Sequence, residues 1–250
     1  MEELLGIALQ SMQQDMERVD RVAMNLSNAL TPAYKREVAV VRTQSSSQAN
    51  SFARLWDAGM ADAVSRNVPE NQVEVLSDTR PGTLKSTGQN LDLAIAGSGY
   101  FEVQTDNGTA YTRQGNFRMD ARGRLVTAQG YPVMGKGGDI YLNTSQPSID
   151  ATGNIVENKL PVGQLKIVQF DKPASLRRLG NGLVAAGEGM AQLQDSEIQV
   201  KQGYLENANV SSMHEMVELT QTMRHFESMQ KVAQGYDEML GTAIRKLGDL

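Results

Sequence analysis

The stretch that decides the fold is LGIALQSMQQDMERVDRVAMNL, residues 5–26, close to the start of the chain. Its apolar residues recur at alternating intervals of four and three, which is the a/d spacing of a coiled-coil helix. Pro32 disfavours helical backbone at the preceding residue, so we expect this helix to stop at Thr31. We predict a helix over residues 1–30 with an interface made of Leu5, Leu9, Met12, Met16, Val19, Ala23 and Leu26.

The other end of the chain carries the same kind of repeat. Positions alternating by three and four run from residue 216 to residue 247, with Gln230 and Asp237 as polar interruptions. Ser212 followed by Glu215 is typical of a capping box, which places the start of this helix near residue 211. We predict that residues 211–250 present an interface made of Met216, Leu219, Met223, Phe226, Ala233, Leu240, Ile244 and Leu247.

Neither apolar stripe can be covered by its own helix, and exposed apolar surface is unfavourable by about 25 cal/mol per Å². Two interpretations stay open: the helices pack on each other within one chain, or they also pack against copies from other chains. Residues 1–30 contain five acidic and two basic residues, and residues 205–250 contain seven and four, so each end carries a net charge of −3. This shared sign slightly weakens pairing within the chain.

Between the two ends the hydrophobic period changes from helical to alternating. Apolar and polar residues alternate in short runs separated by glycine turns, which indicates an antiparallel meander; the runs are 91–95, 100–103, 109–112, 117–119, 124–127 and 131–134, with further strands at 139–142, 149, 155–156 and 164–170. The predicted fold class is therefore α+β, with N- and C-terminal helices forming a coiled-coil-like domain and an inserted, mainly antiparallel all-β domain. The predicted parts are 1–30 with 211–250, a connector over 31–80 containing Trp56 as a local packing anchor, and a β-rich domain over 81–210.

Composition narrows the function classes. The 250 residues carry 24 basic and 29 acidic side chains, 24 − 29 = −5, which gives no electrostatic footprint for nucleic acid or an anionic bilayer. With no cysteine and two histidines, thiolate metal sites and multi-histidine metal centres are disfavoured. No apolar run reaches 18 residues, and the acidic start lacks the features of a cleavable signal, so we expect neither membrane insertion nor signal cleavage.

Three stretches come close to catalytic or binding motifs and each departs from its motif at a required position. Gly97-Ser98-Gly99 lacks the third glycine and the following helix of a dinucleotide loop. The stretch 130–137 ends in Gly137 where a P-loop needs Ser or Thr, so a hairpin connection is the better interpretation. His214-Glu215 is followed by Glu218 where a zinc helix has its second histidine. We therefore predict no catalytic residue, no cofactor and no metal site.

Three regions together resemble the axial proteins of the bacterial flagellum, the rod and hook family. Residues 25–36 (NLSNALTPAYKR) are similar to the rod signature, residues 92–101 (DLAIAGSGYF), 111–117 (YTRQGNF) and 123–126 (GRLV) to the β domain, and residues 203–210 (GYLENANV) and 224–227 (RHFE) to the closing helix region. The positions that match the family motifs are Asn25, Leu26, Asn28, Thr31, Tyr34, Lys35, Asp92, Gly97, Gly99, Thr112, Arg113, Gly115, Phe117, Gly123, Gly130, Asn209, Val210 and Glu227.

The chain departs from the family signature at Ser27, Ala33 and Ala208, where alanine, glycine and serine respectively are usual. If position 33 requires a positive φ angle, alanine there costs on the order of 1 kcal/mol. These departures concern the subtype rather than the family, within which the resemblance favours a proximal-rod over a distal-rod protein.

The resemblance implies a structural subunit of the flagellar basal-body rod, in which the terminal helices form the inner tube of a helical filament and the β domain forms an outer layer. It implies torque transmission, copies of the chain and other rod or hook axial proteins as partners, and export through the flagellar type III apparatus without a cleaved signal peptide. It implies no nucleic acid and no membrane insertion. The alternative from another class is a secreted adhesin or phage-tail-like binding module that is oligomerised by its terminal helices. An enzyme ranks third, with no residue to carry the chemistry.

Overall fold

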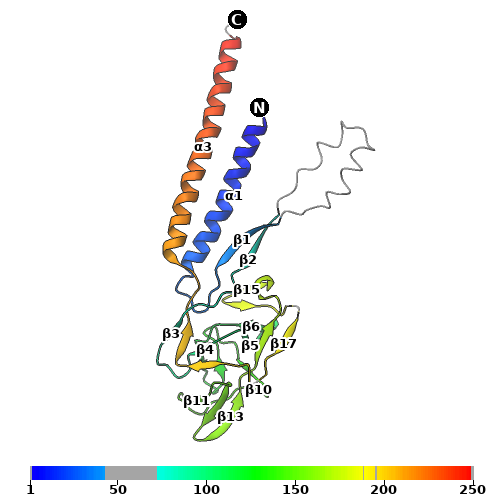
Figure 1. Cartoon of the computed structure of the whole chain (residues 1–250), viewed down its shortest axis with the longest axis vertical. Helices are drawn as coiled ribbons and strands as arrows, with labels where there is room; N and C mark the ends of the chain where they lie inside the picture. The colour runs from blue at the N-terminus through cyan, green and yellow to red at the C-terminus, as the bar shows by residue number, and fades with distance from the viewer. Residues whose placement is uncertain (1, 43–71, 188, 195, 249–250) are drawn as a thin grey trace, which may run out of the picture. The chain divides into compact units, whose positions relative to one another are not determined.

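The computed structural model describes residues 2–42, 72–187, 189–194 and 196–248 (Figure 1). Contacts group residues 1–36 and 77–250 into one compact unit and residues 37–76 into another. The second unit contains a two-stranded sheet of β1 (Glu37–Arg42) and β2 (Gln72–Ser77). Trp56 and the middle of the predicted connector lie outside the described residues. The three-part division of the chain therefore stays a prediction.

Both terminal helices are present. Helix α1 (Glu2–Ser27) ends four residues before the predicted stop at Thr31. The cause is local, because the Ser27 hydroxyl and the Asn28 amide both donate to the Met24 carbonyl and compete for the acceptors of the last turn.

Helix α3 (Ser212–Gly248) begins at Ser212 itself, so the predicted capping box at Ser212 is wrong and the capping residue is Ser211. The hydroxyl of Ser211 accepts from the His214 N–H at 3.5 Å, and the Glu215 N–H donates to the Ser211 carbonyl at 3.0 Å. The Glu215 side chain instead takes its partners from outside the helix.

The middle of the chain is β-rich, and every strand pairing with a recorded register is antiparallel. The largest sheet has six strands in the order β15-β16-β6-β5-β14-β17; its members are β5 (Tyr100–Thr105), β6 (Gly108–Thr112), β14 (Ile167–Phe170), β15 (Arg178–Gly180), β16 (Leu183–Val184) and β17 (Met190–Gln192). A three-stranded sheet consists of β11 (Ser148–Ile149), β12 (Asn154–Glu157) and β13 (Leu160–Gln164).

The remaining strands form two-stranded ladders; these are β3 (Leu84–Ser86) with β19 (Tyr204–Glu206), β4 (Leu93–Ile95) with β18 (Val200–Gln202), β7 (Arg118–Met119) with β8 (Leu125–Val126), and β9 (Met134–Gly135) with β10 (Gly138–Asp139). A short 3-10 helix, η1 (Pro173–Ser175), precedes β15.

Consecutive predicted runs pair in the hairpin of β5 and β6, in which Phe101 lies opposite Thr112, and again in that of β7 and β8. A simple meander order is wrong for the large sheet, because β5 takes β14 as its other neighbour and β6 takes β16. The run expected at 131–134 forms isolated bridges to Val103 of β5 and Val126 of β8. The strands after residue 170 were not predicted. Each has only two or three residues, too few to show a pattern, and most of them pair with a strand far away in the sequence.

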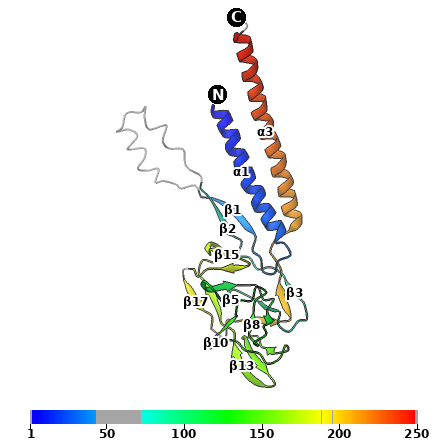
Figure 2. The ribbon, with the colours of Figure 1, turned by 180° about the vertical axis from the view of Figure 1, so that it is seen from behind.

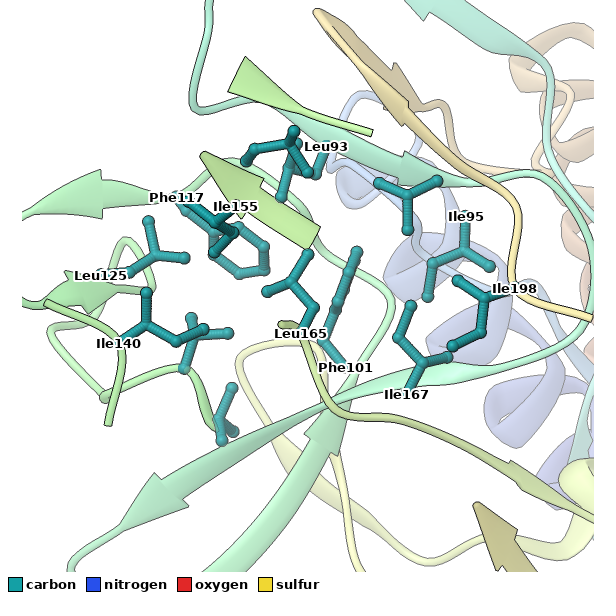
Figure 3. Packing of buried hydrophobic residues seen from close by; sticks show 14 of the residues in the cluster. Leu93, Ile95, Phe101, Phe117, Leu125, Ile140, Ile155, Leu165, Ile167 and Ile198 are labelled. Atoms are coloured by element: carbon teal, nitrogen blue, oxygen red, sulfur yellow. The ribbon is translucent and has the colours of Figure 1, made fainter. Parts of the chain in front are cut away.

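The main hydrophobic core lies in this β region (Figure 3). The rings of Phe101 and Phe117 meet edge to face, with centroids 5.1 Å apart. Ile155 of β12, Ile167 of β14 and Leu165, which lies between β13 and β14, are fully buried in the same cluster. Residues from β4, β5, β8, β12 and β14 thus share one core, which fixes the framework on which the flanking segments rest.

Two turns in this region repeat one design. Asp120 Oδ1 accepts from the N–H groups of residues 122 and 124, and Asp150 Oδ1 accepts from those of residues 152 and 154. In both turns the glycine three positions after the aspartate, Gly123 or Gly153, has φ of 81°. The sequence DA-x-G-x-[LI]-V is present at both sites, so the shared composition produces the same turn twice.

Gly115, one of the predicted family positions, is required by close backbone approach. A Cβ atom there would lie 1.6 Å from the Leu93 carbonyl oxygen. The Leu93 N–H donates to the Gly115 carbonyl at 3.0 Å, so the two segments cannot separate to admit a side chain.

Candidate functional site

Helices α1 and α3 lie side by side and run in opposite directions, as both ribbon views show (Figures 1 and 2). The contacts agree, because Asp15 of α1 meets His225 while Asn25, further along α1, meets Glu215. The buried residues of the interface are Ala8, Asp15, Val22 and Asn25 on α1 and Glu215 and Thr222 on α3. The half-buried residues are Leu5, Met12, Val19 and Leu26 on α1, and Leu219, Phe226, Met229, Ala233 and Tyr236 on α3.

Of the fifteen predicted interface positions, seven are half-buried against the partner helix, six are exposed, and the side chains of two lie outside the described residues. Leu9 and Met16 are 55% and 59% exposed, Met216 and Met223 are 55% and 46% exposed, and Ala23 is also exposed. Leu240 is 38% exposed, and the side chains of Ile244 and Leu247 lie outside the described residues. For Leu9, Met16, Ala23, Met216 and Met223, the residue one position earlier is buried in the intrachain interface. Met229 and Tyr236 accordingly replace the polar interruptions at Gln230 and Asp237.

Polar side chains occupy this interface because each has a partner across it. The carboxylate of Asp15, 5% exposed, lies 2.6 Å from His225 Nδ1. Arg18 lies 4.0 Å from Glu218 on the same side of the helix pair. A prediction that ranks positions by apolarity passes over a buried Asp or Glu, so the polar residues of the intrachain interface were not among the predicted positions.

A network of charged and amide groups joins the bases of the two helices. Glu215 is fully buried; its carboxylate forms an ion pair with Arg36 and accepts from the Asn25 amide at 3.2 Å. Arg36 also donates to Glu218 at 2.9 Å, and the Tyr34 hydroxyl donates to Asn25 Oδ1 at 3.2 Å. A buried carboxylate is stable only with such partners, so these residues fix the start of α3 against the end of α1.

Glu206, at the end of β19, is the second buried carboxylate of the junction. Lys35 Nζ lies 2.6 Å from its Oε1, Arg113 Nε lies 2.8 Å from its Oε2, and the Gly82 N–H donates to Oε1 at 2.9 Å. Burial by itself would raise the pKa of Glu206, but the charges of Arg113 and Lys35 outweigh that effect and hold the pKa below its usual value.

Arg113 uses its remaining donors on backbone carbonyls. Its Nη1 donates to the Gly97 and Gly99 oxygens at 2.9 and 2.8 Å, and its Nη2 donates to the Ile95 oxygen at 3.0 Å. The Gly97-Ser98-Gly99 turn therefore directs carbonyl oxygens at a guanidinium, the opposite polarity from a phosphate-binding loop.

Asn209 connects three segments next to this carboxylate. Its Oδ1 accepts from the Arg36 N–H at 2.7 Å, and its Nδ2 donates to the Asp78 and Arg80 carbonyls at 2.9 Å each. The Ala33 N–H donates to the Glu206 carbonyl at 2.7 Å, and Ala33 has φ of 55°. The positive φ anticipated at this position is thus present.

The structure brings five predicted family residues into this junction, namely Asn25, Tyr34, Lys35, Arg113 and Asn209. The others lie elsewhere: Phe117 in the core, Gly123 and Gly130 in turns, Thr112 bonded to the Gly182 carbonyl, Asp92 bridged to Asn116, and Asn28, Thr31 and Leu26 at the end of α1. Val210 is half-buried and Glu227 is exposed on α3. The sequence analysis did not identify Glu206 and Glu215 as the carboxylates that accept the ion pairs of this junction. The one sign of them in the sequence was an acidic residue within an otherwise apolar pattern.

The remaining motif-like stretches adopt structural roles. Residues 134–139 form the β9–β10 hairpin rather than a phosphate loop followed by a helix. Within the described residues no group of three or more metal-type side chains gathers. In the same part of the chain neither helix is long and apolar enough to cross a bilayer.

Known proteins match this arrangement at both its β and its helical parts. Residues 94–157 match the family model of the flagellar hook protein FlgE/F/G D1 domain, and residues 201–246 match that of the flagellar basal body rod FlgEFG protein C-terminal region. The second match contains Glu206, Asn209 and Glu215 of the junction.

Whole-chain relatives agree. The flagellar basal-body rod protein FlgF of Caulobacter vibrioides is 29% identical over the full length of both chains. The rod protein FlgG of Bacillus subtilis is 31% identical over 89% of this chain and 90% of its own, and FlgG of Agrobacterium fabrum is 30% identical over 97% and 98%.

These matches define the class as a non-enzymatic structural protein of the bacterial flagellum. The chain belongs to the flagellar basal-body rod protein family. The alternative of an adhesin or phage-tail-like module finds no support among these relatives. FlgF and FlgG relatives match at similar identity, so the proximal-rod subtype stays a prediction.

Proposed function

We propose that this rod subunit joins copies of itself and other rod or hook axial proteins into a helical shaft, through its terminal helices, and that the shaft transmits motor torque. The observation that carries the proposal is the exposure of Leu9, Met16, Met216 and Met223 on helices that already pack on each other. Apolar side chains in a regular stripe on an exposed helix face favour a further protein contact. The inner-tube arrangement and coiled-coil packing between subunits belong to this proposal.

Torque transmission requires that the helices and the β region move together. The ion pairs of Glu206 and Glu215 support this role, since both carboxylates are buried and bridge segments from the two ends of the chain. Among the described residues no buried side-chain polar atom lacks a hydrogen-bond partner. A fully satisfied polar network is rigid, which suits a part that carries load.

We further propose that the subunit reaches the rod through the flagellar type III export apparatus, without a cleaved signal peptide, and resides in the periplasm-spanning part of the basal body. Nucleic acid and membrane lipid are not expected partners of a chain with a net charge of −5.

Deleting the gene and imaging purified basal bodies tests the proposal. The expected result is a non-swimming strain whose basal bodies lack part or all of the rod, and the wild-type gene restores both. Normal swimming with an intact rod in the deletion strain would overturn the proposal.

A further inference from the structure

Arg178 connects the outer edge of the large sheet to the segment that follows α1. It is the first residue of β15, the outer strand of the six-stranded sheet. Its Nη2 donates to the Lys35 carbonyl at 2.5 Å and to the Ser77 hydroxyl at 3.0 Å, and its Nε donates to the same hydroxyl at 3.1 Å. A side chain of the sheet thereby holds the main chain that follows α1.

The same guanidinium lies over an aromatic ring that is itself bound to α1. The Arg178 Cζ is 5.1 Å from the centroid of the Tyr34 ring, within the range of a cation–π interaction. The Tyr34 hydroxyl donates to Asn25 Oδ1, and the Asn25 amide donates to the buried Glu215 of α3. A continuous path of contacts therefore runs from β15 through Tyr34 to both terminal helices.

Lys35 is held at both its main chain and its side chain. Its carbonyl accepts from Arg178, while its Nζ lies 2.6 Å from Glu206, the carboxylate that also binds Arg113. Arg113 Nε lies 2.8 Å from this carboxylate. The short segment 34–35 is therefore attached to the β region at two points, through Glu206 to Arg113 and directly to Arg178.

The two arginines lie apart on the large sheet. Arg178 lies opposite Val184 of β16, and Val184 lies opposite Tyr111 of β6, two residues before Arg113. Neighbouring strands are about 4.8 Å apart, so the two points are separated by about 10 Å across the sheet. One attachment would let the β region turn about it, whereas two that diverge from one short segment form a triangle, which resists twisting.

We propose that Arg178 is a torsional brace, which stops the β region from twisting relative to the helix pair about the Glu206 contact. The inference rests on the proposed function, because a subunit that transmits torque must resist this twist. Arginine suits the position, since its planar guanidinium binds two acceptors and stacks on a ring at the same time. A lysine ammonium would keep the charge but has neither the fork nor the plane that these contacts use.

Spin-label distance measurements test the brace on the full-length chain, which contains no cysteine of its own. Thr109→Cys on β6 and Gln221→Cys on α3 are exposed label sites, and this pair reports the spread of distances between the β region and the helix pair. We expect Arg178→Ala and Arg178→Lys each to widen the distance distribution. Arg177→Ala is the matched control, because Arg177 is the adjacent arginine and its side chain is exposed, and it should keep the wild-type width.

Two further label pairs distinguish a brace from a general loss of structure. Glu17→Cys with Gln221→Cys lies within the helix pair, and Thr109→Cys with Ser148→Cys lies within the β region. Both pairs should keep their wild-type widths in Arg178→Ala, because the helices pack on each other and the β region has its own core.

Three results would overturn the brace. The first is a wild-type width between the β region and the helix pair in Arg178→Ala. The second is an equal widening in Arg177→Ala or within either internal pair, which would show a general loosening of the fold. The third is a wild-type width in Arg178→Lys, which would show that the guanidinium contacts are not needed. None of these results touches the proposed function, which fails only if the deletion strain keeps its rod.

Discussion

At the scale of single residues, the junction between the helices and the β region depends on one strained alanine and two buried carboxylates. Ala33 holds a left-handed conformation that ordinarily favours glycine, and its N–H is committed to the Glu206 carbonyl. Glu206 and Glu215 in turn neutralise the buried Arg113 and the half-buried Lys35 and Arg36. Substitutions here should change the free energy of unfolding in two distinct ways: by relieving backbone strain at Ala33, or by leaving charges unpaired around Glu206.

Ala33→Gly should stabilise the protein by about 1 kcal/mol, because glycine adopts φ of 55° without the Cβ penalty. For a domain of this size the melting temperature should rise by about 2–4 °C, measured by calorimetry. Ala121→Gly is the control, since Ala121 is exposed in a turn and has no positive φ, and it should leave stability unchanged or lower it. A lower melting temperature for Ala33→Gly would contradict the strain argument.

Glu206→Gln should destabilise the protein by about 3 kcal/mol, since Lys35 and Arg113 would keep buried charges without a carboxylate. Urea unfolding measures the loss. Glu238→Gln on the exposed face of α3 serves as the matched control and should stay within about 0.5 kcal/mol of wild type. Equal stability of the two variants would show that the buried ion pairs contribute nothing.

The depressed pKa of Glu206 also sets a direction for pH dependence. Its contribution to the free energy of unfolding is complete above its ordinary pKa of 4.5 and is lost as pH falls through the lower pKa of the folded state. The gap in stability between wild type and Glu206→Gln should therefore narrow as the pH is lowered from 6 toward 2. If the difference in stability widened on acidification instead, the pKa of Glu206 would be raised in the folded state rather than lowered, and the prediction would be wrong.

At the scale of elements, each terminal helix has one face that packs on the other helix and an adjacent apolar face that is exposed. The residues at 8, 15 and 22 face α3, and the residues at 9, 16 and 23 face outward. Heptad spacing predicted the existence, extent and apolar character of both helices. It could not separate the two faces, because Leu9 and Met16 are more apolar than the Ala8 and Asp15 that are actually buried. Only the partner of Asp15, His225 on a helix 210 residues away, explains why a carboxylate occupies the interface.

Met16→Lys should leave the isolated protein folded, with a free energy of unfolding within about 0.5 kcal/mol of wild type, because the side chain is 59% exposed. It should nevertheless block incorporation into the rod, since a lysine would be buried at the subunit contact. Swimming of the complemented deletion strain and thermal unfolding of the purified protein are the two measurements.

Val22→Lys is the matched contrast, because Val22 is 1% exposed in the α1–α3 interface, and it should destabilise the isolated protein itself. Restored swimming by Met16→Lys would show that Met16 is not part of the assembly surface.

At the scale of the whole molecule, sequence reasoning predicted an inserted, mainly antiparallel β region but not its sheet order. The β5–β6 hairpin follows from Asp106-Asn107-Gly108 between two alternating runs. The pairing of β5 with β14 depends on Ile167 and Phe101 meeting across a shared core, and no local pattern encodes that encounter. The polar junction was similarly out of reach, since Lys35 and Glu206 lie 171 residues apart.

Association of the rod subunit should strengthen as salt is raised from low to moderate concentration, because screening relieves repulsion between ends that each carry −3. The effect should be modest, since Glu206 and Glu215 are already neutralised within the chain. Light scattering against ionic strength measures it. Steady weakening with salt would contradict the prediction and would point to attractive ion pairs between subunits.

The meeting of three distant segments at Glu206 has a consequence for the timing of folding. Lys35 and Arg113 lie 171 and 93 residues before the carboxylate that neutralises them, so the last strand must arrive before either cation gains its partner. Contacts between such distant segments form slowly. In a polypeptide that leaves a narrow channel with its N-terminus first, this junction would therefore form only after the final portion of the chain had come through.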